Sequence, residues 1–337
     1  MSSCAPETSY LATPEFLKLT LHCMSAIEIP LHLFGAYIVF FRTPSSMSSV
    51  KWPMINLHFW SSFLDIAISL LTVPYVIFPA VAGFPLGLLK EIGVSTAFQV
   101  HLIVTLIALV AVALVTVFSN RYYVMLGSQL STLRKFFRVL FLSVAYVTVS
   151  TFMIPFTLMI PEQTEAVRTV FERFPCLPDY VYEAPVFVYT LDIIPGFVTV
   201  TVLFCTGFST VALFISLTLF NLFKQTRNVT FSQKTISLQK KFLFGLILQT
   251  SIPIIMGIIP ICYMAFVVPQ GYYNQALNNF SFIIFSFHGL LSTISMLLIY
   301  QPYRHATRNI ILSCLCKNKV FERKKSGSNT TGARMNR

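Results

Sequence analysis

The chain has 337 residues, of which 55% are hydrophobic and 11% are charged, and its formal net charge is +12. A soluble globular protein carries roughly 25% charged residues, so this composition excludes a water-soluble fold for the bulk of the chain and requires a bilayer to cover its apolar surface. Net positive charge can also indicate nucleic-acid binding, but in a membrane protein basic residues usually mark the cytoplasmic loops, and no nucleic-acid partner is expected.

Seven apolar stretches long enough to cross a bilayer follow one another along the chain. They cover residues 20–41, 54–78, 98–118, 139–160, 189–220, 242–268 and 280–300. Each is expected to be a helix, because backbone groups in hydrocarbon must be hydrogen-bonded within their own segment. We therefore predict an all-α membrane protein with a seven-transmembrane helix bundle in residues 20–300, an N-terminal segment of residues 1–19 and a basic tail of residues 301–337.

Basic residues fall on alternate connections between these stretches. Twenty of the 24 Lys and Arg residues lie after the first, third and fifth stretches and in the tail, and four lie elsewhere. Because positive charge accumulates on the cytoplasmic side, the N-terminus is predicted to be extracellular and the tail cytoplasmic. The longest outer connection, residues 161–188, either covers a cavity as a lid or is a solvated connector.

Ionisable residues within apolar stretches are costly in lipid and face the bundle interior. Glu28 is interpreted mainly as a structural hydrogen-bonding residue. Asp65, with Asn56 and His58 nearby, either holds the bundle by hydrogen bonds or belongs to a polar cluster that binds an ion, relays a proton or acts as a conformational switch between two packings. Pro253 interrupts the sixth stretch and is a candidate hinge, although proline is also simply tolerated in membrane helices.

The sequence contains no recognisable catalytic, metal-binding or cofactor-binding constellation, so an enzyme is not predicted and no cofactor or metal is expected. Its seven cysteines are scattered and contain no CxxC pair. Apolar residues after the seventh stretch share one face of a predicted short helix on the membrane surface. Cys314 and Cys316 follow this helix and are candidates for palmitoylation, with free buried thiols as the alternative.

Several short motifs occur in a fixed order along the seven stretches. They are Asn56-Leu57-His58-Phe59-Trp60, Asn120-Arg121-Tyr122-Tyr123, Leu238-Gln239-Lys240-Lys241-Phe242, Phe287-His288-Gly289-Leu290-Leu291-Ser292-Thr293 and Pro302-Tyr303-Arg304. As an ordered set that covers most of the chain, they resemble the nematode serpentine receptor class H (Srh) chemoreceptors, a family of seven-transmembrane G-protein-coupled receptors. Two positions depart from related patterns. Ser119 stands where that family commonly has a glutamate, and near Phe98 there is no cysteine of the kind that rhodopsin-like receptors have, so that Cys176 pairs with Cys4 or stays free.

The resemblance implies a chemosensory receptor that binds a small odorant or pheromone-like molecule from outside and signals to a heterotrimeric G protein. Candidate ligand-binding residues, chosen by their depth in the outer halves of the helices, are Phe98, Gln99, His101, Thr105, Tyr189, Asp192, Tyr263, Phe285 and Phe287. Core packing is the alternative role for each aromatic residue among them. Candidate G-protein coupling residues are Asn120, Arg121, Tyr122, Lys240, Lys241 and Arg304.

The resemblance also implies a multi-pass protein of the plasma membrane, in contact with membrane lipid, and of the sensory cilium. The alternative function is a small-molecule transporter or ligand-gated channel, which would need a polar pore. A membrane-embedded enzyme would need convergent histidines or carboxylates near one membrane face.

Overall fold

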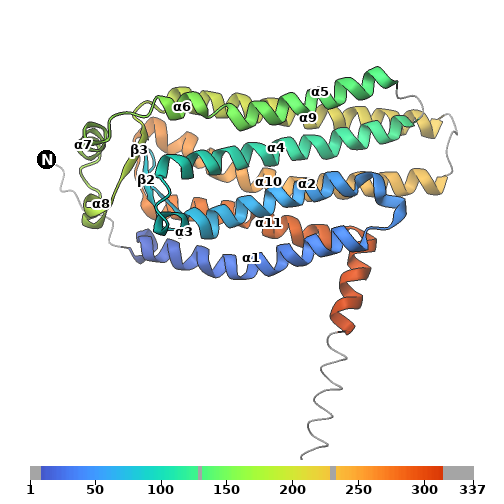
Figure 1. Cartoon of the computed structure of the whole chain (residues 1–337), viewed down its shortest axis with the longest axis horizontal. Helices are drawn as coiled ribbons and strands as arrows, with labels where there is room; N and C mark the ends of the chain where they lie inside the picture. Colours follow the sequence, from blue (N-terminus) through green and yellow to red (C-terminus); the bar gives the residue numbers. More distant parts are fainter. Residues whose placement is uncertain (1–8, 128–130, 228–232, 314–337) are drawn as a thin grey trace, which may run out of the picture.

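The computed structural model describes residues 9–127, 131–227 and 233–313, and its long helices lie side by side in a bundle (Figure 1). Seven helical segments of this part of the chain are long and apolar enough to cross a membrane. They are α1 (Pro14–Arg42), α2 (Ser48–Ile66) continued by the π-helix η3 (Ala67–Thr72), α4 (Thr96–Leu126), α5 (Thr132–Thr151) followed by α6 (Ile154–Leu158), α9 (Ile194–Arg227), α10 (Gln233–Gln270) and α11 (Gln275–Ile299). The predicted seven-helix membrane bundle is confirmed.

Local sequence determines where several of these helices begin. The Thr13 side chain accepts a hydrogen bond from the Phe16 backbone N–H, and Pro14 follows at the first helical position of α1. Ser95 caps α4 and Asn274 caps α11 in the same way. Such side chains satisfy backbone donors that the first turn of a helix leaves free, and proline at the first position costs no hydrogen bond.

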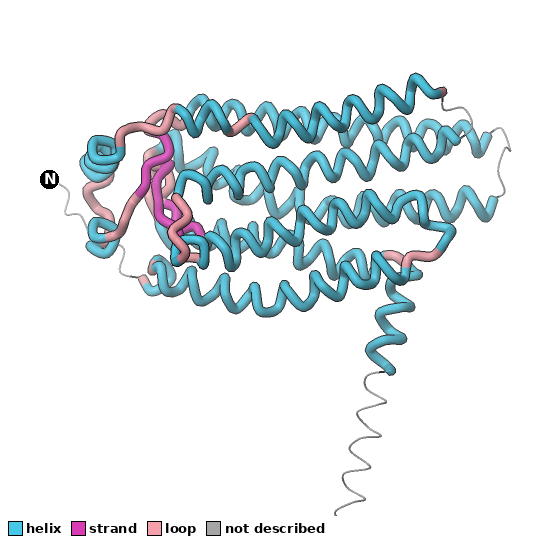
Figure 2. Tube along the Cα trace, in the orientation of Figure 1, coloured by secondary structure: helices cyan, strands magenta, loops and turns pink. Residues whose placement is uncertain are grey.

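A small antiparallel sheet covers one end of the bundle (Figure 2). Its strands are β1 (Pro74–Val76), β2 (Val81–Pro85) and β3 (Phe187–Thr190), in the order β1-β2-β3. The sequence analysis did not predict this sheet, and it assigned residues 74–76 and 189–190 to helical stretches. Pro74 accounts for the first difference, because the residue before a proline is driven out of the α region. Val73 leaves the α region for a left-handed conformation, with φ 44°, and ends the helical segment.

Close backbone packing holds the first two strands together. Tyr75 pairs with Phe84, and their rings stack with centroids 4.9 Å apart. A Cβ atom at Gly83 would overlap the backbone carbonyl of Tyr75, so only glycine allows the two strands to approach this closely. We call this end of the bundle, with β1–β3, the sheet end.

Short helices complete the connections. They are η1 (Tyr10–Ala12), η2 (Ser45–Met47), α3 (Leu88–Glu91), α7 (Gln163–Arg173) and α8 (Asp179–Glu183). α7, α8 and β3 all belong to the long connection of residues 161–188 and its boundary, so this segment is folded over the sheet end (Figure 1). At the opposite end, which we call the tail end, residues 301–313 are helical and turn away from the bundle axis (Figure 1). Cys4, Cys314 and Cys316 lie outside the described residues.

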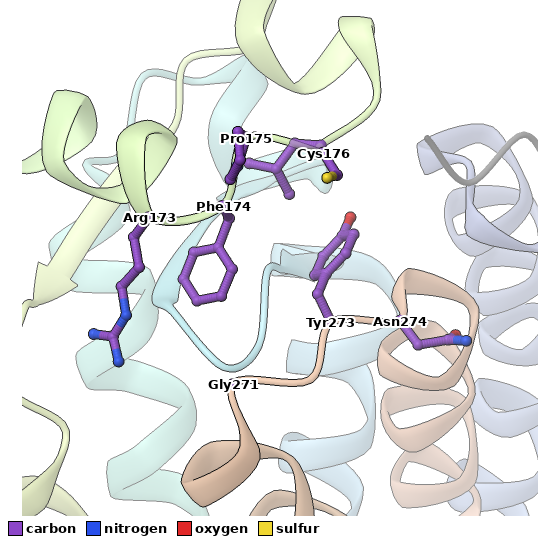
Figure 3. A pocket seen from close by; sticks show the side chains of 8 residues that line it. Arg173, Phe174, Pro175, Cys176, Gly271, Tyr273 and Asn274 are labelled. Atoms are coloured by element: carbon purple, nitrogen blue, oxygen red, sulfur yellow. The ribbon is translucent and has the colours of Figure 1, made fainter. Parts of the chain in front are cut away.

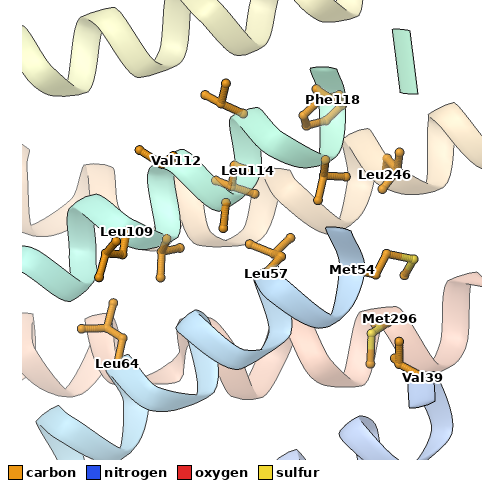
Figure 4. Packing of buried hydrophobic residues seen from close by; sticks show 14 of the residues in the cluster. Val39, Met54, Leu57, Leu64, Leu109, Val112, Leu114, Phe118, Leu246 and Met296 are labelled. Atoms are coloured by element: carbon orange, nitrogen blue, oxygen red, sulfur yellow. The ribbon is translucent and has the colours of Figure 1, made fainter. Parts of the chain in front are cut away.

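The apolar core centres on α4. Leu109, Val112 and Phe118 of α4 pack with Leu57 and Leu64 of α2 and with side chains of α1, α10 and α11 (Figure 4). In the most apolar part of each helix, 61% of the residues of α4 are buried, whereas none are buried in α9 and 6% in α10. A bilayer must therefore cover the outer surfaces of α9 and α10.

Candidate functional site

A group of buried polar side chains joins α1, α2, η3 and α11. It contains Glu28, His32, Asp65, Ser69, His288 and Thr293, and we call it the polar cluster. Asp65 is fully buried at its centre, 2.8 Å from Nδ1 of His288 and 3.1 Å from Nε2 of His32. The backbone N–H of Gly289 donates to the same carboxylate at 3.3 Å. Three donors around one carboxylate satisfy a buried charge that would otherwise be very costly in hydrocarbon.

The helix backbones approach each other closely around Asp65. A Cβ atom at Gly289 would overlap the Asp65 carboxylate, so a larger residue at this position cannot be accommodated without displacing α2 or α11. On the other side of Asp65, the second ring nitrogen of His32 lies 3.0 Å from the Thr293 hydroxyl. His58 donates from Nε2 to the backbone carbonyl of His32 at 2.9 Å. The first of these hydrogen bonds connects α1 with α11, and the second connects α1 with α2.

Glu28 is also fully buried, one turn of α1 before His32. The Ser69 hydroxyl donates to its Oε2 at 3.0 Å. Ser69 lies in the π-helix η3, a type of helical irregularity that is frequent at functional sites. Among the described residues, Oε1 of Glu28 has no hydrogen-bond partner.

The sequence analysis identified Asp65 and Glu28 but not the residues that contact them. Asn56, expected near Asp65, instead donates to the Tyr146 hydroxyl at 2.6 Å and accepts from Trp60 at 3.1 Å. That expected neighbour was wrong, because Asn56 lies on a different face of α2. His32 and His288 were missed as partners, although a histidine within an apolar stretch is itself a signal of a buried polar contact.

At the tail end, Arg121 of α4 is enclosed by α10. Its Nη2 donates to the Gln239 backbone carbonyl at 3.4 Å, and its guanidinium lies 4.8 Å from the centre of the Phe242 ring. The side chain is 8% exposed. A cation over an aromatic face is attracted by about 0.5–2 kcal/mol, depending on how dry the contact is. In this conformation Arg121 therefore holds the tail-end part of α10 against α4.

The other predicted coupling residues lie around this contact with different degrees of exposure. Asn120 is buried, donates to the Ser49 carbonyl at 2.8 Å and accepts from Arg138 at 2.8 Å. Tyr122 packs against Phe214 of α9 with ring centroids 5.9 Å apart. Lys240, Lys241 and Arg304 are exposed. Pro253 lies within α10, between this end and the sheet end.

The predicted ligand-binding residues are divided among separate contacts near the sheet end. His101 of α4 lies 3.3 Å from the Thr157 hydroxyl, which is in turn 3.3 Å from the Tyr189 hydroxyl. Tyr263 of α10 donates to Asn278 of α11 at 2.8 Å. The structure thus brings His101 and Tyr189 together through Thr157, and Tyr263 belongs to another group.

The remaining candidates differ in exposure and packing. Phe98 and Asp192 are exposed, and Asp192 accepts from the Ile194 backbone N–H in its own turn. Gln99 is buried and donates to the Val94 carbonyl. Phe285 stacks on His288 with ring centroids 5.2 Å apart, and so contacts the polar cluster directly. Thr105 and Phe287 are half-buried, and Phe287 packs against the apolar cluster of the sheet end.

A cavity of about 470 Å³ opens at the sheet end, between the end of α7 and the connection from α10 to α11 (Figure 3). Its lining residues are Arg173, Phe174, Pro175, Cys176, Leu177, Gly271, Tyr273 and Asn274. The volume is in the range of small-molecule sites, and the lining combines aromatic rings with a guanidinium group. None of the nine predicted ligand-binding residues is part of this lining. Cys176 is disulfide-bonded, so the alternative that it stays free was wrong, whereas Cys23, Cys205 and Cys262 are free.

Comparison with known proteins agrees with this arrangement. A family model described as "Serpentine type 7TM GPCR chemoreceptor Srh" matches residues 12–313. The chain is also similar to "Serpentine receptor class H-72" of Caenorhabditis elegans, with 22% identity over 317 residues that cover 92% of this chain and 90% of that protein. The match to the family includes the whole helix bundle, the sheet and the polar cluster.

Proposed function

Because this chain belongs to the Srh family of serpentine seven-transmembrane chemoreceptors, we propose that it is a chemosensory G-protein-coupled receptor. It binds a small odorant or pheromone-like molecule at the sheet end and signals to a heterotrimeric G protein at the tail end. The contact of Arg121 with α10 is the observation that carries this proposal, because it supplies a closed state that ligand binding can open.

The distribution of charge supports an outward-facing sheet end. Of the 17 basic residues in the described part of the chain, 13 lie at the tail end, on or beside the connections after α1, α4 and α9 and in residues 301–313. We infer that the tail end is cytoplasmic and that the protein is a multi-pass protein of the plasma membrane. Placement in a sensory cilium is a proposal from the family.

Activation requires α10 to move away from Arg121. α10 contacts α11 extensively and α9 little, and most of its apolar surface faces lipid. Movement of its tail-end part about Pro253 would separate Leu243 and Leu246 from the apolar core around α4, together with the Arg121 contact. It would uncover Arg121 beside the already exposed Lys240 and Lys241 and create a basic surface for the G protein.

The ligand site is proposed between the polar groups of the helices and the folded connection above them. His101, Thr157 and Tyr189 supply a polar group below the sheet, and the cavity beside Arg173 provides an opening at its edge. Phe285 connects this region with the polar cluster through its stacking on His288. A ligand that contacts Phe285 can therefore change the packing of α11 against α1 and α2.

The Arg121 contact can be tested in cells that express the receptor with a suitable G protein. Phe242→Ala removes the ring under the guanidinium, and loss of about 1 kcal/mol from the closed state should raise basal second-messenger signalling roughly fivefold. Phe244→Ala is the matched control, because Phe244 lies on the same helix and is exposed toward lipid. Equal basal signals from both variants would contradict the closed-state contact.

The coupling surface and the function itself need a separate measurement. An odorant panel should give a ligand-dependent signal in the wild-type receptor, and replacement of Arg121, Lys240 and Lys241 together by alanine should abolish it while surface expression is retained. A signal that survives this triple replacement would argue against the proposed surface. Ligand-gated current in a bilayer without G protein would instead favour a channel.

A further inference from the structure

The cavity at the sheet end lies between two ordered walls. One wall is the segment after α7, where Cys176 is disulfide-bonded and Leu177 is buried in the apolar cluster of this end. The other wall is the turn between α10 and α11, in which the Gly271 and Tyr272 backbone N–H groups donate to carbonyls of the last turn of α10. Both walls are held by the folded protein, so the cavity exists before a ligand arrives.

The described lining of this cavity combines aromatic rings with one charged group. In Figure 3 the ring of Phe174 belongs to the first wall and the ring of Tyr273 to the second, with Gly271 below them. Arg173 contributes a guanidinium group, and none of the described lining residues carries a carboxylate. Such a lining suits a small molecule with an apolar body and one polar end.

Arg173 forms no ion pair with any described carboxylate, although the connection of residues 161–188 contains five acids. Glu172, which precedes it, pairs instead with Arg168 at 2.8 Å. The Glu162 carboxylate accepts from backbone N–H groups at the start of α7. Because a guanidinium group presents several N–H donors that match the two oxygens of a carboxylate, an anion in the cavity would supply the missing partner.

A cationic molecule fits the same lining poorly. The Arg173 guanidinium lies 5.7 Å from the centre of the Phe174 ring and already occupies this aromatic surface. A second cation beside that ring would be repelled by the first. The charge of the lining therefore favours an anion over a cation of the same size.

We propose that the cavity at the sheet end binds a small organic acid, with the carboxylate of the ligand on Arg173 and its apolar body between the rings of Phe174 and Tyr273. This inference rests on the proposed receptor function and names the chemical class of the ligand. The connection of residues 161–188 then forms part of the binding site, in addition to joining α6 to α9.

Pairs of probe molecules that differ in charge can test this class of ligand in purified receptor. The probes are benzoate, phenylacetate and hexanoate, each compared with its primary amide, which has nearly the same size and no charge. Binding is measured by equilibrium dialysis in detergent solution at low salt. At least one acid should bind roughly tenfold more tightly than its amide, because hydrogen bonds between charged groups are the stronger ones. Added salt should reduce this difference, since the cavity is open to water.

Arg173→Gln removes the charge from the lining. The affinity for the acid should fall roughly tenfold, to that for the amide, while the affinity for the amide stays the same. Lys90→Gln is the matched control, because Lys90 is also an exposed basic residue in the last turn of a short helix at the sheet end and does not line the cavity. It should keep the preference for the acid.

A pair of glycines offers a second, independent test. Gly271 and Gly93 have φ of 60° and 78°, and at neither does any atom lie within 4 Å of an added Cβ. Aspartate tolerates this left-handed conformation better than most residues. Gly271→Asp adds a carboxylate to the lining and should weaken binding of the acid more than binding of the amide. Gly93→Asp adds the same charge away from the cavity and should change neither.

Three results would overturn the proposal. They are equal binding of acid and amide in all three pairs, a preference for the acid that survives Arg173→Gln, and equal binding of the acid by Gly271→Asp and Gly93→Asp. Cellular signals that come only from neutral odorants and are unchanged in Arg173→Gln would contradict the acid site and support the receptor function. Binding of an acid to purified receptor needs no G protein, so Arg173-dependent binding without a cellular signal would support the site and contradict coupling instead.

Discussion

The two sides of the helix bundle are built in different ways. In the most apolar parts of α1, α2, α4 and α11, which we call the packed half, 39%, 44%, 61% and 44% of residues are buried. In α5, α9 and α10, the exposed half, the values are 11%, 0% and 6%. The buried carboxylates and the histidines that contact Asp65 all belong to the packed half. The packed half is therefore held in place by buried hydrogen bonds, whereas most of the apolar surface of the exposed half must be covered by lipid.

This difference fits the division of tasks expected in a receptor. Buried polar networks fix one arrangement of helices, because any shift leaves charged groups without partners. Helices that face lipid can shift at lower cost, since one apolar surface replaces another. We therefore expect the packed half to act as a frame and the exposed half, particularly α10, to carry the movement.

The largest effect should come from the centre of the frame. Asp65→Asn removes the charge that His32 and His288 approach, and loss of one partner in a buried ionic group costs about 3–5 kcal/mol. Its free energy of unfolding in mixed detergent should fall by that amount. Glu172→Gln is the control, because Glu172 pairs with Arg168 at 2.8 Å on the exposed surface of α7, where such pairs contribute about 0–1 kcal/mol. An Asp65→Asn protein as stable as this control would contradict the frame.

A smaller effect is expected from close packing alone. Gly289→Ala places a methyl group against the Asp65 carboxylate, and overpacking of this kind costs about 1–3 kcal/mol. Gly207→Ala is the same change in α9, where no atom lies within 4 Å of the added carbon. It should leave stability unchanged or raise it slightly, because alanine favours helix. If the two changes had the same effect in the same unfolding assay, the two halves would not differ in packing as described.

The smallest effect is expected outside both halves. The Glu162 carboxylate accepts hydrogen bonds from the Thr164 and Glu165 backbone N–H groups at the start of α7, and these bonds lower the pKa of Glu162. A lowered pKa in the folded state stabilises α7 above the pKa of the unfolded chain, and this contribution is lost as pH falls through the folded value. The protection factors of the α7 amides, which compare observed exchange with the intrinsic rate at the same pH, should therefore fall in acid.

The matched variants for this cap are Glu162→Gln and Glu165→Gln. Glu162→Gln should accelerate exchange at neutral pH and remove most of the acid dependence, while leaving α1 and α11 unchanged. Glu165→Gln, one turn into the same helix, should retain the acid dependence. If both variants respond to pH as the wild type does, Glu162 does not cap α7.

The bundle could be predicted from sequence because hydrocarbon allows few backbone structures, and long apolar stretches must be helices there. The sheet could not, because β1 and β3 have only three and four residues and lie within or beside apolar stretches. Its second pairing joins Val81 to Thr190, far apart in the chain. Short strands with distant partners have no local periodicity that would distinguish them from the ends of helices.

The candidate site was predictable only as single residues. A charge such as Asp65 in an apolar stretch must find a partner, and this much follows from the cost of burial. Which residues serve as partners depends on how α1, α2 and α11 pack, and His32 and His288 gave no spacing signal along one helix. The same limit applies to Arg121, whose position at a helix end is visible in the sequence, whereas its contact with Phe242 is not.

The sheet end also has a consequence for biosynthesis. Gln275 and Asn278 of α11 donate to the backbone carbonyls of Val76 and Phe78, 199 and 200 residues earlier, and Asn279 donates to Leu11, 268 residues earlier. A ribosome adds about 5–20 residues per second, so the β1–β2 hairpin waits roughly 10–40 s after its own synthesis for these amides to emerge. The nascent chain must keep this hairpin unaggregated until its last membrane helix has been inserted.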